Sequence, residues 1–145
     1  MKKILFSLLA LAFTVSLSAQ NTPDKVAKFK SDVIDLGKIE VGNPKTATFH
    51  FSNIGATPLI IEQANPTCGC TIGDYTKAPV AKGKDGWIKA TYNAASIGAF
   101  DKKMSVKFAG VDGTKDITIK GEVLSKEDYA KYIASTKKST TPAKP

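Results

Sequence analysis

The chain has 145 residues, a length that suits one domain with a single hydrophobic core. Its formal net charge is +8, from 21 basic and 13 acidic residues, and every basic residue is lysine. Arginine, whose planar guanidinium binds phosphate or guanine through two parallel hydrogen bonds, is absent, so the composition argues against a nucleic-acid-binding protein.

The first residues have the pattern of an export signal. Two lysines precede a largely apolar run over residues 4–17, and two small residues follow it. We therefore predict a signal peptide over residues 1–19, cleaved after Ala19. The run is shorter than the roughly 20 residues of a membrane-spanning helix, so we do not expect the chain to span a membrane. The expected location is the periplasm or the extracellular medium, without a lipid anchor, because no cysteine follows the run directly.

After a polar lead over residues 20–28, apolar and polar residues alternate in short segments separated by Gly, Pro and Asn. Such alternation places one face of a strand in a core and the other in solvent. In the clearest case, Ala47, Phe49 and Phe51 share one face. The predicted strands are Phe29–Leu36, Thr46–Asn53, Leu59–Gln63, Cys70–Gly73, Gly86–Tyr92, Phe100–Phe108 and Asp116–Val123. Their spacing predicts one antiparallel β-sandwich of about seven strands over residues 29–124.

The pattern changes beyond residue 124. Ser125 and Asp128, three positions apart, are typical of a helix N-terminus, and two tyrosines and an isoleucine follow at helical spacing. We predict a short helix over residues 125–134. Residues 135–145 are almost all Lys, Thr, Ser, Ala and Pro, which bury too little apolar surface to order a chain, so we predict a disordered tail.

Cys68 and Cys70 are the only cysteines. Residues two apart in a flat strand have Cα atoms about 6.6 to 6.8 Å apart, at the upper limit of disulfide geometry. A bridge between them therefore requires the chain to bend, which Gly69 permits. A ring this small would be strained and reducible.

Three interpretations of this pair stay open. It stiffens a turn or packs as two small apolar side chains, which we prefer because cysteine is often simply buried. Alternatively it exchanges with external thiols, although no helix N-terminus or neighbouring base is evident to favour a thiolate. In the third, Cys68 and Cys70 bind a soft metal such as Cu(I), although His50 and Met104 are the only other soft ligands beyond the signal, and the spacing indicates no third ligand.

Trp87 is the other side chain that could carry function. If Ile88 and Tyr92 face the core, Trp87 lies on the outer row and could anchor a partner, or else it caps one end of the core.

His50 falls on an outward row with no nucleophile beside it in sequence. Paired carboxylates, metal-spaced histidines, a phosphate loop and a nucleophile elbow are absent from the sequence, so we expect neither an enzyme nor a cofactor.

Several short stretches, taken in order, resemble a known family. They are Gly37-Lys38-Ile39, Phe49-His50-Phe51-Ser52-Asn53, Cys68-Gly69-Cys70-Thr71 and the closing Ile119-Lys120-Gly121-Glu122-Val123. From Asp35 to Val123 the chain resembles the exported bacterial family catalogued as domain of unknown function 1573. The resemblance implies an all-β, immunoglobulin-like sandwich of seven strands, related in fold to domains of ciliary and centrosomal proteins, with no established activity.

Together these features predict a non-catalytic, exported binding or structural module of the bacterial envelope, whose partner is a protein or a glycan. The alternative is an exported thiol protein that uses Cys68 and Cys70 for redox exchange or copper binding. Because one sandwich fold hosts many unrelated tasks, the fold does not identify a specific ligand.

Overall fold

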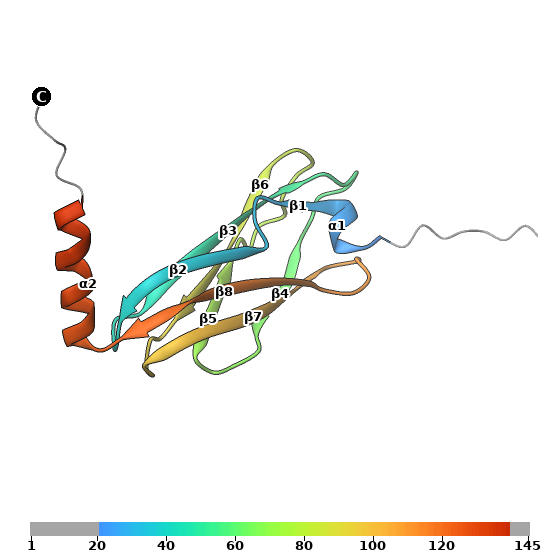
Figure 1. Cartoon of the computed structure of the whole chain (residues 1–145). Helices are drawn as coiled ribbons and strands as arrows, with labels where there is room; N and C mark the ends of the chain where they lie inside the picture. The colour runs from blue at the N-terminus through green and yellow to red at the C-terminus, as the bar shows by residue number, and fades with distance from the viewer. Residues whose placement is uncertain (1–20, 140–145) are drawn as a thin grey trace, which may run out of the picture.

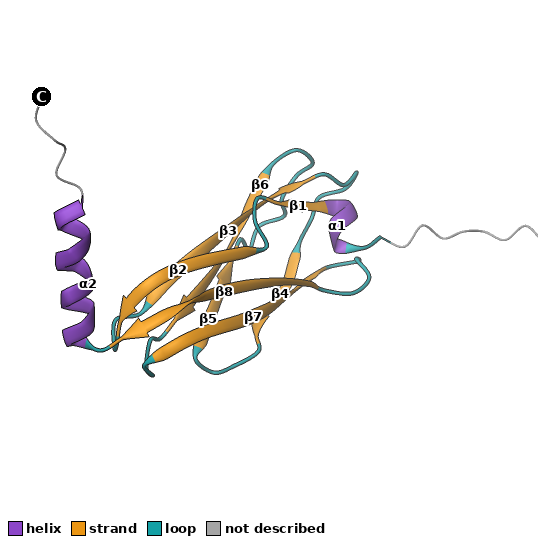
Figure 2. Cartoon of the chain, viewed as in Figure 1, coloured by secondary structure: helices purple, strands orange, loops and turns teal. Residues whose placement is uncertain are grey.

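The computed structural model describes residues 21–139, which fold into two β-sheets packed face to face with one helix at each end (Figures 1 and 2). The predicted signal peptide over residues 1–19 and the last six residues of the predicted tail lie outside the described part. The elements are α1 (Pro23–Val26), β1 (Ala27–Phe29), β2 (Val33–Glu40), β3 (Lys45–Asn53), β4 (Ile61–Pro66), β5 (Thr71–Tyr75), β6 (Asp85–Tyr92), β7 (Gly98–Phe108), β8 (Lys115–Leu124) and α2 (Lys126–Ser139).

The strand order confirms the predicted all-β sandwich. One sheet has the order β1-β3-β6-β5 and the other has the order β2-β8-β7-β4. Neighbouring strands in both sheets run antiparallel, except that β2 runs parallel to β8, which corrects the prediction of a wholly antiparallel sandwich. β4 and β5 belong to different sheets, and so do β1 and β2, so the connection within each pair joins the two sheets.

The predicted first strand, Phe29–Leu36, is wrong as a single element. Its start belongs to β1, which pairs with β3, and its remainder belongs to β2 in the opposite sheet. Ser31 causes the break, because its Oγ donates to the carbonyl of Val33 at 2.5 Å and accepts from the Val33 amide at 3.3 Å. This local turn competes with the sheet ladder for backbone groups, so the described residues form eight strands rather than seven.

The core lies between the two sheets and follows the predicted alternation. Ala47, Phe49 and Phe51 of β3 are all buried. Phe51 meets Phe108 of β7 edge to face, with ring centroids 5.4 Å apart, so the two sheets interlock through aromatic side chains. Full burial of one such ring contributes about 2 to 3 kcal/mol, which makes this aromatic contact a main source of stability.

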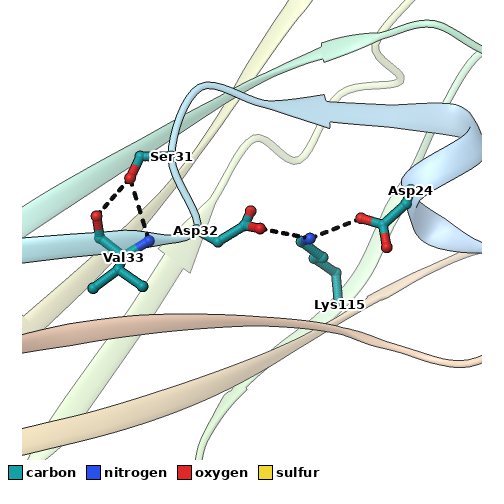
Figure 3. Close-up of polar contacts among 5 residues, drawn as sticks. All are labelled: Asp24, Ser31, Asp32, Val33 and Lys115. Carbon is teal, nitrogen blue, oxygen red and sulfur yellow. Dashed lines mark hydrogen bonds and ion pairs between the residues drawn. The ribbon is translucent and has the colours of Figure 1, made fainter.

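The segment that the sequence indicates as a polar lead is partly folded into the domain. Pro23 and Val26 of α1 are buried, and so is Ala27, the first residue of β1. Lys115 at the start of β8 anchors this segment, because its Nζ lies 2.7 Å from Asp24 Oδ1 and 2.9 Å from Asp32 Oδ2 (Figure 3). The hydrogen bonds that Lys115 donates to Asp24 and, with a smaller effect, to Asp32 raise the pKa of Lys115. One ammonium group thus connects α1, the β1–β2 link and β8.

Helix α2 projects from the end of the sandwich opposite α1 (Figure 1). Ser125 caps it, because its Oγ accepts from the Asp128 amide at 3.1 Å and donates to the Asp128 carboxylate at 2.7 Å. The helix continues to Ser139, five residues beyond the predicted end, through a stretch predicted to be disordered. An ion pair between Lys131 and Glu127, one turn apart at 3.0 Å, supports this exposed helix. Within residues 21–139, neither helix is long and apolar enough to cross a membrane.

Candidate functional site

Cys68 and Cys70 lie in the short connection that carries the chain from β4 to β5, and they form a disulfide. Their Cα atoms are 5.3 Å apart, well below the spacing of about 6.6 Å expected in a flat strand, so the chain bends between them. Both side chains are half-buried, and Gly69 between them is exposed. The pair therefore closes a small loop at the edge of the sandwich.

This loop is attached to both sheets by hydrogen bonds. The Thr67 amide and the Thr67 Oγ1 both donate to the carbonyl of Lys103 in β7, each at 3.0 Å. On the other sheet, the Asn93 amide, just after β6, donates to the carbonyl of Cys70 at 3.0 Å. The disulfide loop, defined as residues 67–70, is thus held in one position relative to the core.

Thr71, the first residue of β5, is a buried polar side chain beneath the disulfide. It is 4 % exposed, and its Oγ1 lies 3.7 Å from Cys68 Sγ. A disulfide sulfur carries no hydrogen, so the hydroxyl must donate and the sulfur must accept. Among residues 21–139, this sulfur is the only hydrogen-bond partner of the Thr71 hydroxyl. Sulfur in a disulfide is a weak acceptor, so this hydroxyl is only weakly satisfied.

A second loop, residues 93–97, connects β6 to β7 and begins beside the disulfide loop, where the Asn93 amide bonds to Cys70. Ala94 in this loop is fully buried and has φ 53°, a left-handed conformation that costs a non-glycine residue about 1 to 2 kcal/mol. Its carbonyl accepts from the Gly42 amide at 2.9 Å, which helps to hold that conformation. Ile97, at the other end of the loop, is 64 % exposed, the largest exposed fraction among the exposed large hydrophobic residues of the described part. We call residues 67–70 and 93–97 together the disulfide end.

Trp87 and His50 lie elsewhere, on the outer face of the β1-β3-β6-β5 sheet. They occupy directly opposed positions of β6 and β3, where Trp87 is half-buried and His50 is exposed. The Nζ of Lys89 lies 4.6 Å from the Trp87 ring, so a cation covers part of the indole. The cysteines directly precede β5, the edge strand of this sheet, whose first residue, Thr71, pairs with the last residue of β6. The structure therefore does not bring Trp87 or His50 to the disulfide.

In the described residues, the fold brings no further metal ligand to Cys68 and Cys70, the pair predicted as an alternative metal site. Met104 is buried in the core rather than exposed beside a cysteine. No group of three or more His, Cys, Asp or Glu side chains in residues 21–139 is arranged to hold a metal ion. In the bonded state, Cys68 and Cys70 also present no thiolate, the form in which cysteine binds metals. Copper binding would require prior reduction of the disulfide.

Sequence reasoning missed Thr71 and Ile97. Thr71 directly follows the Cys-Gly-Cys run, but its burial beneath Cys68 depends on the bend at Gly69. Ile97 is an apolar residue in a short polar loop, and single exposed apolar residues are common on protein surfaces. Its large exposed fraction, at the end of a loop whose first residue bonds to Cys70, distinguishes it.

Comparisons with known proteins agree on the fold. The chain resembles a protein of unknown function from Porphyromonas gingivalis W83, at 17 % identity and a TM-score of 0.58 over 77 % of this chain and 51 % of that chain, so it spans about half of that protein. It also resembles the ASH/PapD-like domain 7 of human CEP192, at 13 % identity and a TM-score of 0.55, over 86 % of this chain and 99 % of that chain.

A third similar structure is the SrpA adhesin from Streptococcus sanguinis, at 8 % identity and a TM-score of 0.51, over 77 % of this chain and 62 % of that chain. At these identities the likeness shows the fold alone. No curated protein sequence matches the chain. The family model described as protein of unknown function (DUF1573) matches residues 27–123, which is most of the sandwich, so the chain belongs to this family.

Proposed function

We propose that the protein is an exported, non-catalytic binding module of the bacterial envelope, and that it binds a protein or glycan partner through the disulfide end. The observation that carries this proposal is Ile97, a large apolar side chain that is 64 % exposed on an ordered loop. Leaving such a side chain in water forgoes about 1.5 to 3 kcal/mol of burial. A partner that covers Ile97 would recover that free energy.

The loops at this end also suit binding because they are already ordered. The disulfide closes the first loop, and the hydrogen bond from the Asn93 amide to the Cys70 carbonyl joins it to the second. A rigid surface loses little conformational entropy when a partner binds, and preorganisation of this kind strengthens binding. The export part of the proposal is supported by the signal pattern over residues 1–19.

The proposal of a non-catalytic role is supported by the kind of groups that this end presents. They are an apolar side chain, main-chain groups and a closed disulfide, which suit contact with a partner rather than proton transfer.

A cosedimentation experiment with isolated envelopes of the producing bacterium tests this surface. We expect the wild-type protein to bind saturably and Ile97→Asp to bind at least tenfold more weakly. Ile54→Asp is the matched control, since Ile54 is 48 % exposed but follows the far end of β3. Equal loss of binding in both variants, or in neither, would contradict the proposal.

A second candidate function is thiol exchange by the disulfide itself. It is supported by the bonded pair in a half-exposed loop with a buried hydroxyl on one sulfur. Replacement of both cysteines by serine separates the two functions. The double variant should keep envelope binding if the protein is a binding module, and it should lose its activity if that activity is thiol exchange.

A further inference from the structure

We infer that the Cys68–Cys70 disulfide is a polarised exchange site: an external thiolate attacks Cys70, and Cys68 leaves as a thiolate that the Thr71 hydroxyl stabilises. This inference rests on the second candidate function, thiol exchange, and specifies its chemistry. It assigns different roles to two cysteines that the sequence does not distinguish, and it makes Thr71 a positioning residue.

A hydrogen bond joins the Thr71 hydroxyl to the sulfur of Cys68. The Thr71 hydroxyl is buried, and within residues 21–139 its only partner is Cys68 Sγ at 3.7 Å. Sulfur in a disulfide accepts weakly, whereas a thiolate is an ionised acceptor, and hydrogen bonds to ionised groups are roughly twice as strong. Reduction would therefore give this buried hydroxyl a better partner than it has in the oxidised protein.

The surroundings of Cys70 differ from those of Cys68. Cys70 packs against the hydrophobic core, and in the described part of the chain no hydrogen bond reaches its sulfur. An apolar environment without a donor disfavours a thiolate. Of the two sulfurs, Cys68 is thus the better leaving group, and leaving groups that form stable thiolates depart faster.

The disulfide is accessible enough for attack. Both cysteines are half-buried rather than buried. A methyl group built on Gly69, between them, would meet no atom within 4 Å, so the outer side of the loop is open to solvent. A small thiol such as glutathione can therefore approach without unfolding the sandwich.

The reaction consumes two external thiols. The first attacks Cys70 Sγ as a thiolate and forms a mixed disulfide, while the electron pair of the broken bond goes to Cys68 Sγ. A second external thiolate then attacks the external sulfur of the mixed disulfide, which releases Cys70 as a thiol after it gains a proton. In total, the protein disulfide gains two electrons and two protons, and the two external thiols become one external disulfide.

The test equilibrates the full-length protein with glutathione or dithiothreitol buffers of graded potential and counts free thiols by alkylation and intact mass. We expect Thr71→Val to shift the exchange equilibrium about tenfold toward the disulfide, which is about 30 mV for a two-electron couple. Thr71→Ser keeps the hydroxyl, so its exchange equilibrium should stay within about twofold of the wild-type value. An unshifted Thr71→Val, or a Thr71→Ser that shifts equally, would overturn the inference.

A second measurement needs no variant and applies even if Thr71→Val does not fold. The wild-type protein is mixed with excess glutathione, quenched with acid and mapped by peptide mass. We expect glutathione on Cys70, and glutathione mainly on Cys68 would overturn the inference. The dithiothreitol series distinguishes failure of this inference from failure of the second candidate function. A protein that only strongly reducing dithiothreitol buffers reduce is no exchange protein. Its Thr71 variants would still show whether Cys68 is the better leaving group.

Discussion

Single side chains at the two ends of this sandwich have distinct tasks. At one end, Ile97 is left in solvent, in a loop whose first residue, Asn93, bonds to Cys70. At the other end, the ammonium of Lys115 joins the carboxylate of Asp24 in α1 to that of Asp32 in the β1–β2 link. The first arrangement gives up burial free energy, and the second adds to stability. The exposed Ile97 therefore makes the disulfide end the candidate binding surface.

Lys115→Met should destabilise the protein by about 1 kcal/mol, because Lys115 is only 15 % exposed in its side chain but its partners are largely solvated. The folded-state pKa of Lys115 is raised above 10.5, so its contribution is fully present below pH 10.5 and is lost as the pH rises through the higher folded value. Urea unfolding at a series of pH values checks this. The gap between wild type and variant should be constant from pH 7 to 9 and should narrow above about pH 10.5, and a gap that widens there would contradict the assignment.

Trp87→Ala should lower the free energy of unfolding by about 1 to 2 kcal/mol, because the indole is half-buried and partly covered by Lys89. Envelope binding should stay unchanged, since Trp87 lies on the outer face of the β1-β3-β6-β5 sheet. Urea unfolding and cosedimentation on the same samples test both statements. If the variant lost binding but kept its stability, the partner would bind this sheet face rather than the disulfide end.

At the scale of elements, the sandwich depends on close contact between the backbone of one strand and the side chains of its neighbour. Gly86 of β6 lies directly opposite Phe51 of β3, whose ring occupies the space that a side chain at position 86 would need. A Cβ at position 86 would lie 2.4 Å from Phe51 Cζ, far inside van der Waals contact. Phe51 in turn packs on Phe108, so a disturbance at Gly86 reaches both sheets.

Gly86→Ala should therefore destabilise the protein by about 2 to 3 kcal/mol through overpacking of the core. Gly69→Ala is the matched control, since a Cβ there meets nothing within 4 Å, and its effect should stay within about 0.5 kcal/mol. Chemical unfolding of both variants measures the difference. Equal effects would show that the Phe51 ring can move aside without cost.

The same elements show why sequence predicts part of this fold. The alternation of Ala47, Phe49 and Phe51 identifies β3 and its buried face, because period-two burial is a local property. The break at Ser31 is not predictable in this way, since it depends on one side chain bonding to the backbone of Val33. The parallel pairing of β2 with β8 joins segments far apart in the chain, and no local pattern encodes it.

The candidate site shows the same limit. Cys68 and Cys70 are evident from composition alone, and the need for a bend at Gly69 follows from strand geometry. The hydrogen bond from Thr71 to Cys68 spans only three positions, but the burial of Thr71 arises only when β5 pairs with β6. Functional geometry of this kind is a tertiary property, so spacing in the sequence does not reveal it.

At the scale of the whole molecule, the disulfide should shape the surface more than it stabilises the domain. It closes a loop of only three residues, for which loop-closure entropy predicts about 1 to 2 kcal/mol. The combined variant Cys68→Ser/Cys70→Ser should therefore remain folded, with a free energy of unfolding lower by that amount. Thermal and urea unfolding measure this, and an unfolded double variant would show that the core depends on the bridge.

The central claim is that the exported domain contacts a partner through its disulfide end. The most direct measurement places a photo-crosslinking amino acid at position 97, and separately at position 54, in intact cells of the producing bacterium. We expect position 97 to yield a discrete adduct with another envelope molecule and position 54 to yield none. An adduct at position 54 only, equal adducts at both positions, or no adduct at position 97 would contradict the claim.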